Sequence, residues 1–303
     1  MKAFEYVSPL QAGIPTKLAL FSDIHIDNPN CDKALLKKHL DYCLNDKRYI
    51  LIGGDLFDAI LLQDKKRAVN SLLEKSDNQL NVKLEETAHF LDPYKENILF
   101  IGRGNHEESI LKYSGFDLLQ MLTTLLNAVN KNHQIQYGNY SNFIRLTWTK
   151  GNAGKMFLHY DILQSHGMGS NAPVSKGAID FNRIIHGTNA DLCWLGHKHN
   201  SSILASDPIM YVDSSGEVKM KNRQAIMTPS YLKANTVDYN INFAERFYTH
   251  QSLPGFGEVN LTPRYEDNKP YLESEVKLNV NPTLSVGNAI SQKLKQRQLT
   301  KQR

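Results

Sequence analysis

The sequence has few cysteines and no long apolar run, and both shortages exclude classes of protein. Its three cysteines, Cys31, Cys43 and Cys193, are widely separated and form no CxxC pair. An odd number of scattered thiols argues against a disulfide framework and fits a reducing, cytoplasmic setting. No apolar run approaches the ~20 residues that a membrane helix needs, and none precedes Pro9. We therefore expect neither a membrane span nor a signal peptide.

An excess of one charge is also lacking. The chain of 303 residues has 35 basic and 31 acidic side chains, a formal net charge of +4, which favours an anionic partner only mildly. Hydrophobic residues make up 41%, enough for a full core. We expect one domain over residues 1–280. The segment 281–303 is polar and basic, which predicts a poorly ordered tail.

Short apolar runs alternate with segments of helical spacing. Helices are predicted over residues 33–44, 63–91 and 116–129. Such alternation is typical of a layered α/β domain with some parallel strands. The runs that predict buried strands are 18–21, 49–52, 98–101 and 192–195.

The middle of the chain has a different pattern. Residues 143–149 alternate apolar and polar side chains, a turn over 151–154 follows, and 155–164 returns as strand. This predicts an antiparallel meander beside the first sheet. Residues 175–190 predict a helix or a mobile loop, and the pattern after His199 is again strand-like.

Each apolar run that predicts a strand is followed by residues of the types that bind metals. In open α/β sheets, ligands bind beyond the carboxyl ends of the strands. Residues separated by one in a strand point to the same face, so each DxH or HxH pair can aim at one pocket. Carboxylate, imidazole and amide oxygen suit hard to borderline divalent ions. The four segments are SDIH (22–25), GGDLFD (53–58), GRGNHE (102–107) and GHKH (196–199).

Each fragment also has an ordinary structural explanation. A single DxH is common, Asp55 could cap a helix or sit in a turn, and His106 could be a surface histidine. The joint pattern is informative because four motifs occur in one order, each after a predicted strand.

The series DxH, GDxxD, GNHE, H and GHxH resembles the calcineurin-like metallophosphoesterase superfamily over residues 18–199. The resemblance implies two packed mixed β-sheets flanked by helices. It also implies a histidine at a strand end between GNHE and GHxH. His166, in QSHG, fits this place. His159 is the competitor, but it stands in the middle of a predicted strand without a following glycine.

The resemblance further implies two divalent metal ions (Mn²⁺, Fe or Zn²⁺), which would supply hydroxide from water near neutral pH. His106 would act in catalysis by protonating the leaving oxygen or stabilising charge. Asp58 and Glu107 would orient the ligating histidines. The first metal would be held by Asp23, His25, Asp55 and His199, and the second by Asp55 as a bridge with Asn105, His166 and His197.

Differences from the motifs of particular branches of the superfamily narrow the range of expected substrates. Protein phosphatases of this superfamily usually read GDxVDRG, but no arginine follows Asp58 here. Purple acid phosphatases have a tyrosine ligand in place of Asp58, and lipid A-pathway pyrophosphatases read GNRD where this chain reads GNHE. The remaining resemblance is to exonuclease and cyclic-nucleotide phosphodiesterase branches, and residues 166–177 resemble phage-encoded members. We therefore expect a small phosphodiester or nucleotide phosphoester as substrate.

Alternatives to that substrate remain at this stage. One is a nuclease acting on DNA ends or single strands, another a phosphoprotein phosphatase in which Arg103 or Arg183 replaces the missing clamp. Lys176 and Lys198 could contact phosphate, although single cations near loops are more often solvated. A non-catalytic scaffold is also possible, but the intact ligand set disfavours it. The long spacing between Asp55 and Asn105 predicts a helical insertion over 63–91 that shapes access to the site.

Overall fold

A computed structural model describes residues 1–58, 79–131, 133–150, 155–167, 169, 177–213, 215–233, 252–267 and 269–280. The predicted tail 281–303, the turn 151–154 and the first part of the predicted insertion, 63–78, lie outside these residues. Among the described residues, no helix is long and apolar enough to cross a membrane.

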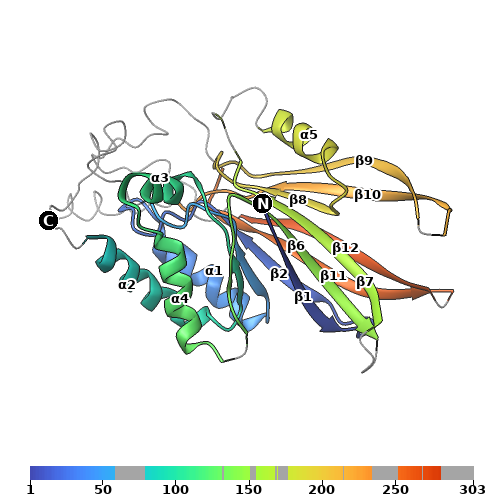
Figure 1. Ribbon diagram of the computed structural model, residues 1–303, viewed down its shortest axis with the longest axis horizontal. Helices are drawn as coiled ribbons and strands as arrows, with labels where there is room; N and C mark the ends of the chain where they lie inside the picture. Colours follow the sequence, from blue (N-terminus) through green and yellow to red (C-terminus); the bar gives the residue numbers. More distant parts are fainter. Residues whose placement is uncertain are drawn as a thin grey trace, which may run out of the picture.

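Two six-stranded mixed sheets form the centre of the fold, as predicted (Figure 1). One has the order β12-β11-β2-β3-β4-β5, made of Lys269–Val280, Gly255–Glu266, Thr16–Phe21, Tyr49–Ile52, Ile98–Ile101 and Gln136–Tyr137. The other has the order β1-β6-β7-β8-β10-β9, made of Lys2–Pro9, Ser141–Lys150, Lys155–Ser165, Leu192–Leu195, Val218–Met227 and Ser202–Val212.

The alternation of side chains along the strands produces the layers. In β2, Leu18 and Leu20 pack into a core shared with Ile162 and Trp194 of the other sheet. Phe21, on the opposite face of β2, packs into the core beneath the helices. Both faces of β2 are therefore buried over residues 18–21, which is why this part of the strand is a continuous apolar run.

Helices cover the outer faces of the two sheets (Figure 1). The helices α1, α2 and α4 share a core with the sheet that contains β2, and α5 shares one with the sheet that contains β8. Asp32 caps α1, because its carboxylate accepts the N–H of Leu35 at 3.1 Å. The helices are α1 (Lys33–Asn45), α2 (Gln79–Leu91), α3 (Asn105–Ser114), α4 (Leu118–Val129) and α5 (Ala178–His186), and a 3₁₀ turn, η2, spans Asp92–Tyr94.

The four predicted strands are confirmed as β2, β3, β4 and β8. The predicted meander is antiparallel, since β6 pairs with β7 in that sense. Its position beside the first sheet was wrong, because β6 and β7 join β8 in the second sheet, stacked across the core. The strand β1 and the helix α3 were not predicted. The described part of the predicted insertion, 79–91, is the helix α2, and residues 175–190, predicted as a helix or a mobile loop, contain the helix α5.

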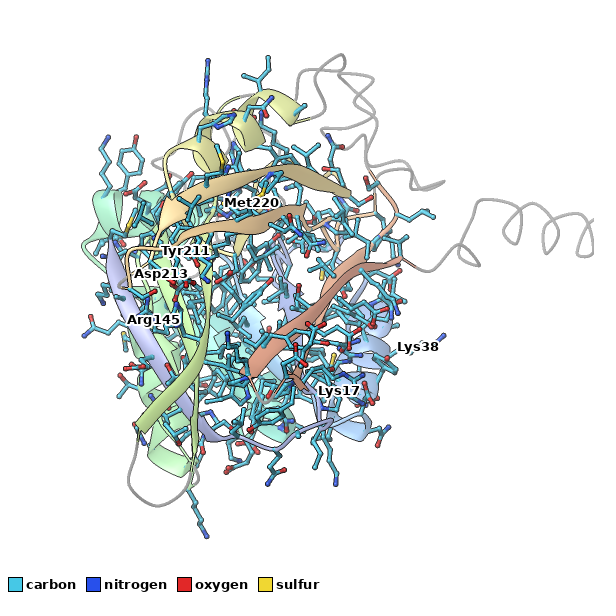
Figure 2. All side chains as sticks on the ribbon, turned by 90° about the vertical axis from the view of Figure 1, so that its right-hand side faces the viewer. Lys17, Lys38, Arg145, Tyr211, Asp213 and Met220 are labelled. Carbon is cyan, nitrogen blue, oxygen red and sulfur yellow. The ribbon has the colours of Figure 1, made fainter. Side chains whose placement is uncertain are left out.

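The hairpin of β9 and β10 ends in exposed side chains at one edge of its sheet. Tyr211 and Met220 are among them, and Figure 2 labels both together with Asp213. The segments described next follow the carboxyl ends of β2, β3, β4, β7 and β8.

Candidate metal centre

Five loops, three from one sheet and two from the other, bring the predicted ligands together. Asp23 and His25 follow β2, Asp55 follows β3, and Asn105 follows β4 as the first residue of α3. In the second sheet, His166 follows β7, and the pair His197 and His199 follows β8. The strands β2, β3 and β4 are parallel, as are β7 and β8. Their carboxyl ends therefore meet at one edge of the sandwich.

Left-handed backbone, and not strand alternation, aims the ligands. Five of them have positive φ: Asp23 (52°), His25 (48°), Asp55 (50°), His197 (70°) and His199 (54°). The expectation that the DxH and HxH pairs share the face of a strand was therefore wrong, since both pairs lie beyond the strand ends. Asp and His adopt this region more readily than most residues. Such conformations persist where the surrounding structure holds them, and they cluster at functional sites.

The loop after β2 is held by hydrogen bonds to the loop after β3. The N–H of Asp23 donates to the carbonyl of Gly54 at 3.0 Å, and the N–H of His25 donates to the carbonyl of Asp55 at 3.0 Å. On its other side, the carbonyl of Asp23 accepts the hydroxyl of Ser230 at 2.7 Å. The ligand loops are thus fixed by the protein's own backbone.

Two glycines allow carboxylates to lie against backbone. A Cβ at Gly104 would lie 2.1 Å from Oδ1 of Asp55, and one at Gly196 would lie 2.7 Å from Oδ2 of Asp23. Any larger residue would have to displace a predicted ligand. This explains the glycine that precedes Asn105 and the one that precedes His197.

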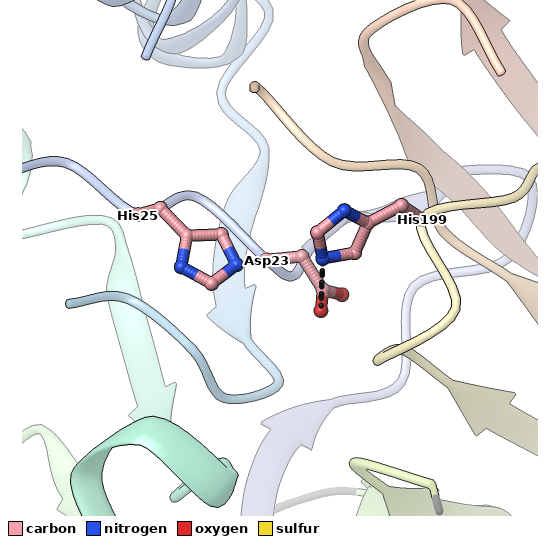
Figure 3. Close-up of side chains that lie close together, drawn as sticks. All are labelled: Asp23, His25 and His199. Atoms are coloured by element: carbon pink, nitrogen blue, oxygen red, sulfur yellow. Dashed lines mark ion pairs between the residues drawn. The ribbon is translucent and has the colours of Figure 1, made fainter. Parts of the chain in front are cut away.

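One group of three side chains could hold a metal ion: Asp23, His25 and His199 (Figure 3). Their ligand atoms all lie within 4.8 Å of one another. Nε2 of His199 lies 3.5 Å from Oδ1 of Asp23, the contact drawn as a dashed line. These are three of the four residues predicted for the first metal.

A second group consists of Asp55, His166 and His197. Nε2 of His166 lies 3.1 Å from Oδ2 of Asp55 and 3.0 Å from Oδ1 of Asn105. The structure therefore brings together all four residues predicted for the second metal. His159, the competitor of His166, lies on an exposed position of β7 and belongs to none of these groups.

Asp55 lies between the two groups. Its Oδ2 is 3.1 Å from His166 and 3.9 Å from His25 and from His106, and a third possible metal group contains His25, Asp55 and His106. Burial acts to raise the pKa of Asp55, but the charges of His166 and His106 outweigh it and hold the pKa well below its usual range. Its Oδ1 accepts the N–H of His106, in the first turn of α3, at 3.0 Å.

The donor set fits a divalent metal. Asp23 and Asp55 are buried carboxylates with 0% and 1% exposure, and buried charges are stable only when paired or bound to a cation. Burial of His166 acts to lower its pKa, but the charges of Asp55 and Asp23 raise it to about 9. Both ring nitrogens of the buried His25 lack a hydrogen-bond partner among the described residues. A cation bound by nitrogen and oxygen donors would satisfy these groups.

Asp58, which was predicted to orient ligating histidines, contacts one predicted ligand, His25, and also His106, which was predicted not to bind metal. Its Oδ1 lies 3.4 Å from Nδ1 of His25 and 3.1 Å from Nδ1 of His106. Burial acts to raise the pKa of Asp58, yet the close contacts with the His106 and His25 rings lower it far below its usual range. Asp58 therefore stays a carboxylate that fixes the ring orientation.

Glu107 differs from expectation, because it contacts loop backbone and no ligating histidine. Its carboxylate accepts the N–H groups of Asp55 at 3.1 Å, Phe57 at 2.8 Å and Gly104 at 2.9 Å. It therefore ties the loop after β3 to the start of α3. Burial, together with the charge of Asp55, raises the pKa of Glu107 to about 7.

Two of the basic side chains considered as phosphate contacts, Arg103 and Lys198, are bound to other side chains of the protein. Arg103 donates to Asp117 at 2.8 Å and bonds to the Tyr137 hydroxyl. Lys198 is 8% exposed and forms an ion pair with Asp180 of α5. Lys176 lies outside the described residues.

A tyrosine that sequence reasoning missed supports His166. The hydroxyl of Tyr140 donates to the carbonyl of Gly167 at 2.5 Å, and its backbone carbonyl accepts the N–H of His166 at 3.0 Å. The two rings meet edge to face, with centroids 5.4 Å apart. No motif marks a tyrosine at this distance from the histidine in the sequence.

Comparison with known proteins agrees with this geometry. Residues 16–201 match the family model of the calcineurin-like phosphoesterases, and the chain belongs to that family. It is therefore a metal-dependent phosphoester hydrolase. None of the curated proteins matches the sequence.

The similar solved structures are distant in sequence. Vacuolar protein sorting 29 from Cryptosporidium parvum is 12% identical with a TM-score of 0.34, and the match covers 88% of this chain and 99% of that one. A double mutant of Vps29 from Entamoeba histolytica is 12% identical with a TM-score of 0.36, covering 86% and 99%. GAP50, the anchor in the inner membrane complex of Plasmodium, is 12% identical with a TM-score of 0.36, and the match covers 93% of this chain and 94% of that one. The family assignment rests on the family model.

Proposed function

We propose that the protein is a dinuclear-metal phosphodiesterase that hydrolyses phosphodiester or nucleotide phosphoester bonds. The observation that carries the proposal is the position of Asp55, whose Oδ2 lies 3.1 Å from His166 of one group and 3.9 Å from His25 of the other. A carboxylate in this position can bridge two ions. Two such ions, when bound, lower the pKa of water and neutralise charge on the phosphate.

His106 would serve as the general acid. Its Nδ1 lies 2.9 Å from the backbone carbonyl of Asp58 and 3.1 Å from Oδ1 of the same residue. A carbonyl oxygen only accepts, so Nδ1 carries a proton and donates it there. In the imidazolium form Nε2 carries a second proton, and it lies on the side of Asp55, at 3.9 Å, where it can give that proton to the leaving oxygen and leave the ring neutral. Asp58 fixes the ring in that orientation.

A diester fits the charges around the site better than a phosphoprotein does. A monoester carries two negative charges and favours a bidentate guanidinium clamp. Arg103 is held by Asp117 and Tyr137, and Arg183 is an exposed residue near the end of α5. The lysine between the metal-site histidines, Lys198, is paired with Asp180. A diester carries one charge and can be neutralised by two metals and His106.

Kinetics with Mn²⁺ test the substrate class. We expect kcat/KM to be highest for a nitrophenyl phosphodiester or a cyclic nucleotide, compared with a nucleoside monophosphate and a phosphopeptide. Single-stranded DNA belongs in the same comparison, and its preferred cleavage would identify a nuclease. The Asp55→Asn variant controls for contaminating activity. A tenfold preference for the phosphopeptide, ~1.4 kcal/mol of transition-state stabilisation, would refute the diester assignment and leave the metal chemistry intact.

A further inference from the structure

One side chain of α2 joins this helix to a buried carboxylate of the loop after β2. Nζ of Lys83 lies 2.6 Å from Oδ2 of Asp27. The side chain of Asp27 is 3% exposed and that of Lys83 is 25% exposed. The ion pair therefore joins the surface of the helix to the interior of the protein. Asp27 is two residues after His25 in the sequence.

The other oxygen of Asp27 faces the loop after β3. Its Oδ1 accepts the backbone N–H of Asp58 at 2.6 Å. Asp58 in turn holds Nδ1 of His106 with both its backbone carbonyl and its carboxylate, at 2.9 and 3.1 Å. Asn28 supports the same carboxylate from the side, with Nδ2 at 2.8 Å from Oδ2 of Asp58. An unbroken series of contacts thus leads from Lys83 to the His106 ring.

The burial of Asp27 allows a change at Lys83 to affect Asp58. A carboxylate with almost no exposure needs partners for its charge. The partners of Asp27 include a lysine of the helix on one oxygen and, on the other, a backbone amide of the loop that carries Asp58. If the lysine is lost, the buried charge loses its cationic partner, and its remaining contact with the N–H of Asp58 must adjust. The orientation of His106 then loses one of its constraints.

We propose that Asp27 and Lys83 are positioning residues for His106, and that α2 contributes to catalysis through them. The inference rests on the proposed role of His106 as general acid. It assigns to α2 the task of holding the acid in line with the leaving group. Neither residue touches substrate or the reacting atoms.

The experiment uses two diesters of the same nucleoside phosphate, one with a phenyl and one with a 4-nitrophenyl leaving group. The poorer leaving group, phenolate (conjugate acid pKa ~10, as for tyrosine), depends more on protonation. For Lys83→Met and Asp27→Asn, we expect kcat on the phenyl ester to fall roughly tenfold, since small misplacements of a catalytic group have effects up to 10²-fold. On the nitrophenyl ester the fall should stay under about twofold, with KM and bound manganese unchanged in both variants.

Matched variants separate positioning from general damage. Lys83→Arg keeps the charge and should restore most of the phenyl-ester activity. Lys37→Met breaks an exposed lysine–aspartate pair on α1, at 2.7 Å, and should leave both rates unchanged. Equal losses on the two esters, or loss of manganese in step with activity, would overturn the proposal.

The His106→Ala variant separates this inference from the proposed function. It should lose more activity on the phenyl ester than on the nitrophenyl ester. If His106→Ala alone shows this dependence, the link through Asp27 and Lys83 is wrong and the general acid stands. If His106→Ala lacks it, both assignments are wrong.

Discussion

Replacing Gly104 by alanine tests the position of Asp55 with a single methyl group. Gly104 precedes α3, and a Cβ there would lie 2.1 Å from Oδ1 of Asp55 and 2.4 Å from its backbone nitrogen. The backbone of Gly104 is extended, with φ −110° and ψ −174°, so alanine adds no conformational strain. The effect of the substitution therefore comes from the steric contact with Asp55.

The size of the effect follows from the distance. Ordinary van der Waals contact begins at 3.4 Å, so Oδ1 of Asp55 and the new methyl group must separate by 1.3 Å (3.4 − 2.1). The other oxygen, Oδ2, lies 3.1 Å from Nε2 of His166, and it would move together with Oδ1. A misplacement of about 1 Å at a reacting centre lowers the rate by roughly 10²-fold. We expect a loss of that order in kcat for Gly104→Ala, with less than the full complement of bound metal.

Gly115→Ala is the matched control at the other end of α3. Gly115 has φ +70°, and nothing lies within 4 Å of a Cβ placed there. Alanine at this position should lower the free energy of unfolding by ~1 kcal/mol through backbone strain and leave turnover unchanged. For both variants we would measure metal content by mass spectrometry, kcat, and the free energy of unfolding in urea. If Gly104→Ala keeps its metal and its turnover to within a small factor, Asp55 is not placed as we argue.

Four further outcomes are expected. Asp55→Asn should weaken both metal sites, and retention of two ions per chain would contradict its bridging role. His106→Ala should keep its metal and lose roughly two or more orders of magnitude in turnover, whereas loss of metal would make it a ligand. Only His166→Ala, and not His159→Ala, should reduce metal content. Burial lowers the pKa of His39 to about 4, below ~6.5 in the unfolded chain, so its neutral ring contributes stability above pH 6.5 that is lost as pH falls toward 4. His39→Gln should therefore reduce the fall in unfolding free energy between pH 7 and 4.5 by roughly 1–2 kcal/mol, as measured by urea unfolding.

The sequence was most informative where burial is complete on both faces of a strand. The strands β2, β3, β4 and β8 are short apolar runs because both faces lie in cores. The strand β1 was missed because it is an edge strand, in which only Phe4 and Tyr6 pack against the core and the exposed residues that alternate with them, Ala3, Glu5 and Val7, are of mixed character. Because apolar residues stand on both faces of this strand while only one face is buried, its sequence lacks the alternation that marks a half-buried strand.

The helix α3 was missed for a related reason. Its buried residues are Glu107 and Ile110, so the apolar periodicity that marks a helix is absent. The buried Glu107 is held by amides that lie about 50 residues earlier in the chain, those of Asp55 and Phe57, besides Gly104 nearby. A sequence pattern gives no sign of such partners, which is why Glu107 was assigned to a histidine.

The conformation of the ligands explains why the motifs located the site while their assumed geometry was wrong. A left-handed residue costs about 1–2 kcal/mol relative to its ordinary conformation, less for residues such as Asp. Five predicted ligands adopt it, and bonds such as the 3.0 Å contact from the N–H of Asp23 to the carbonyl of Gly54 hold them there. The residue types at these positions therefore meet two demands together, because they bind metal and they tolerate positive φ. The prediction considered only metal binding and assumed that strand alternation aims the side chains, so it selected residues that lie together but assigned their orientation to the wrong cause.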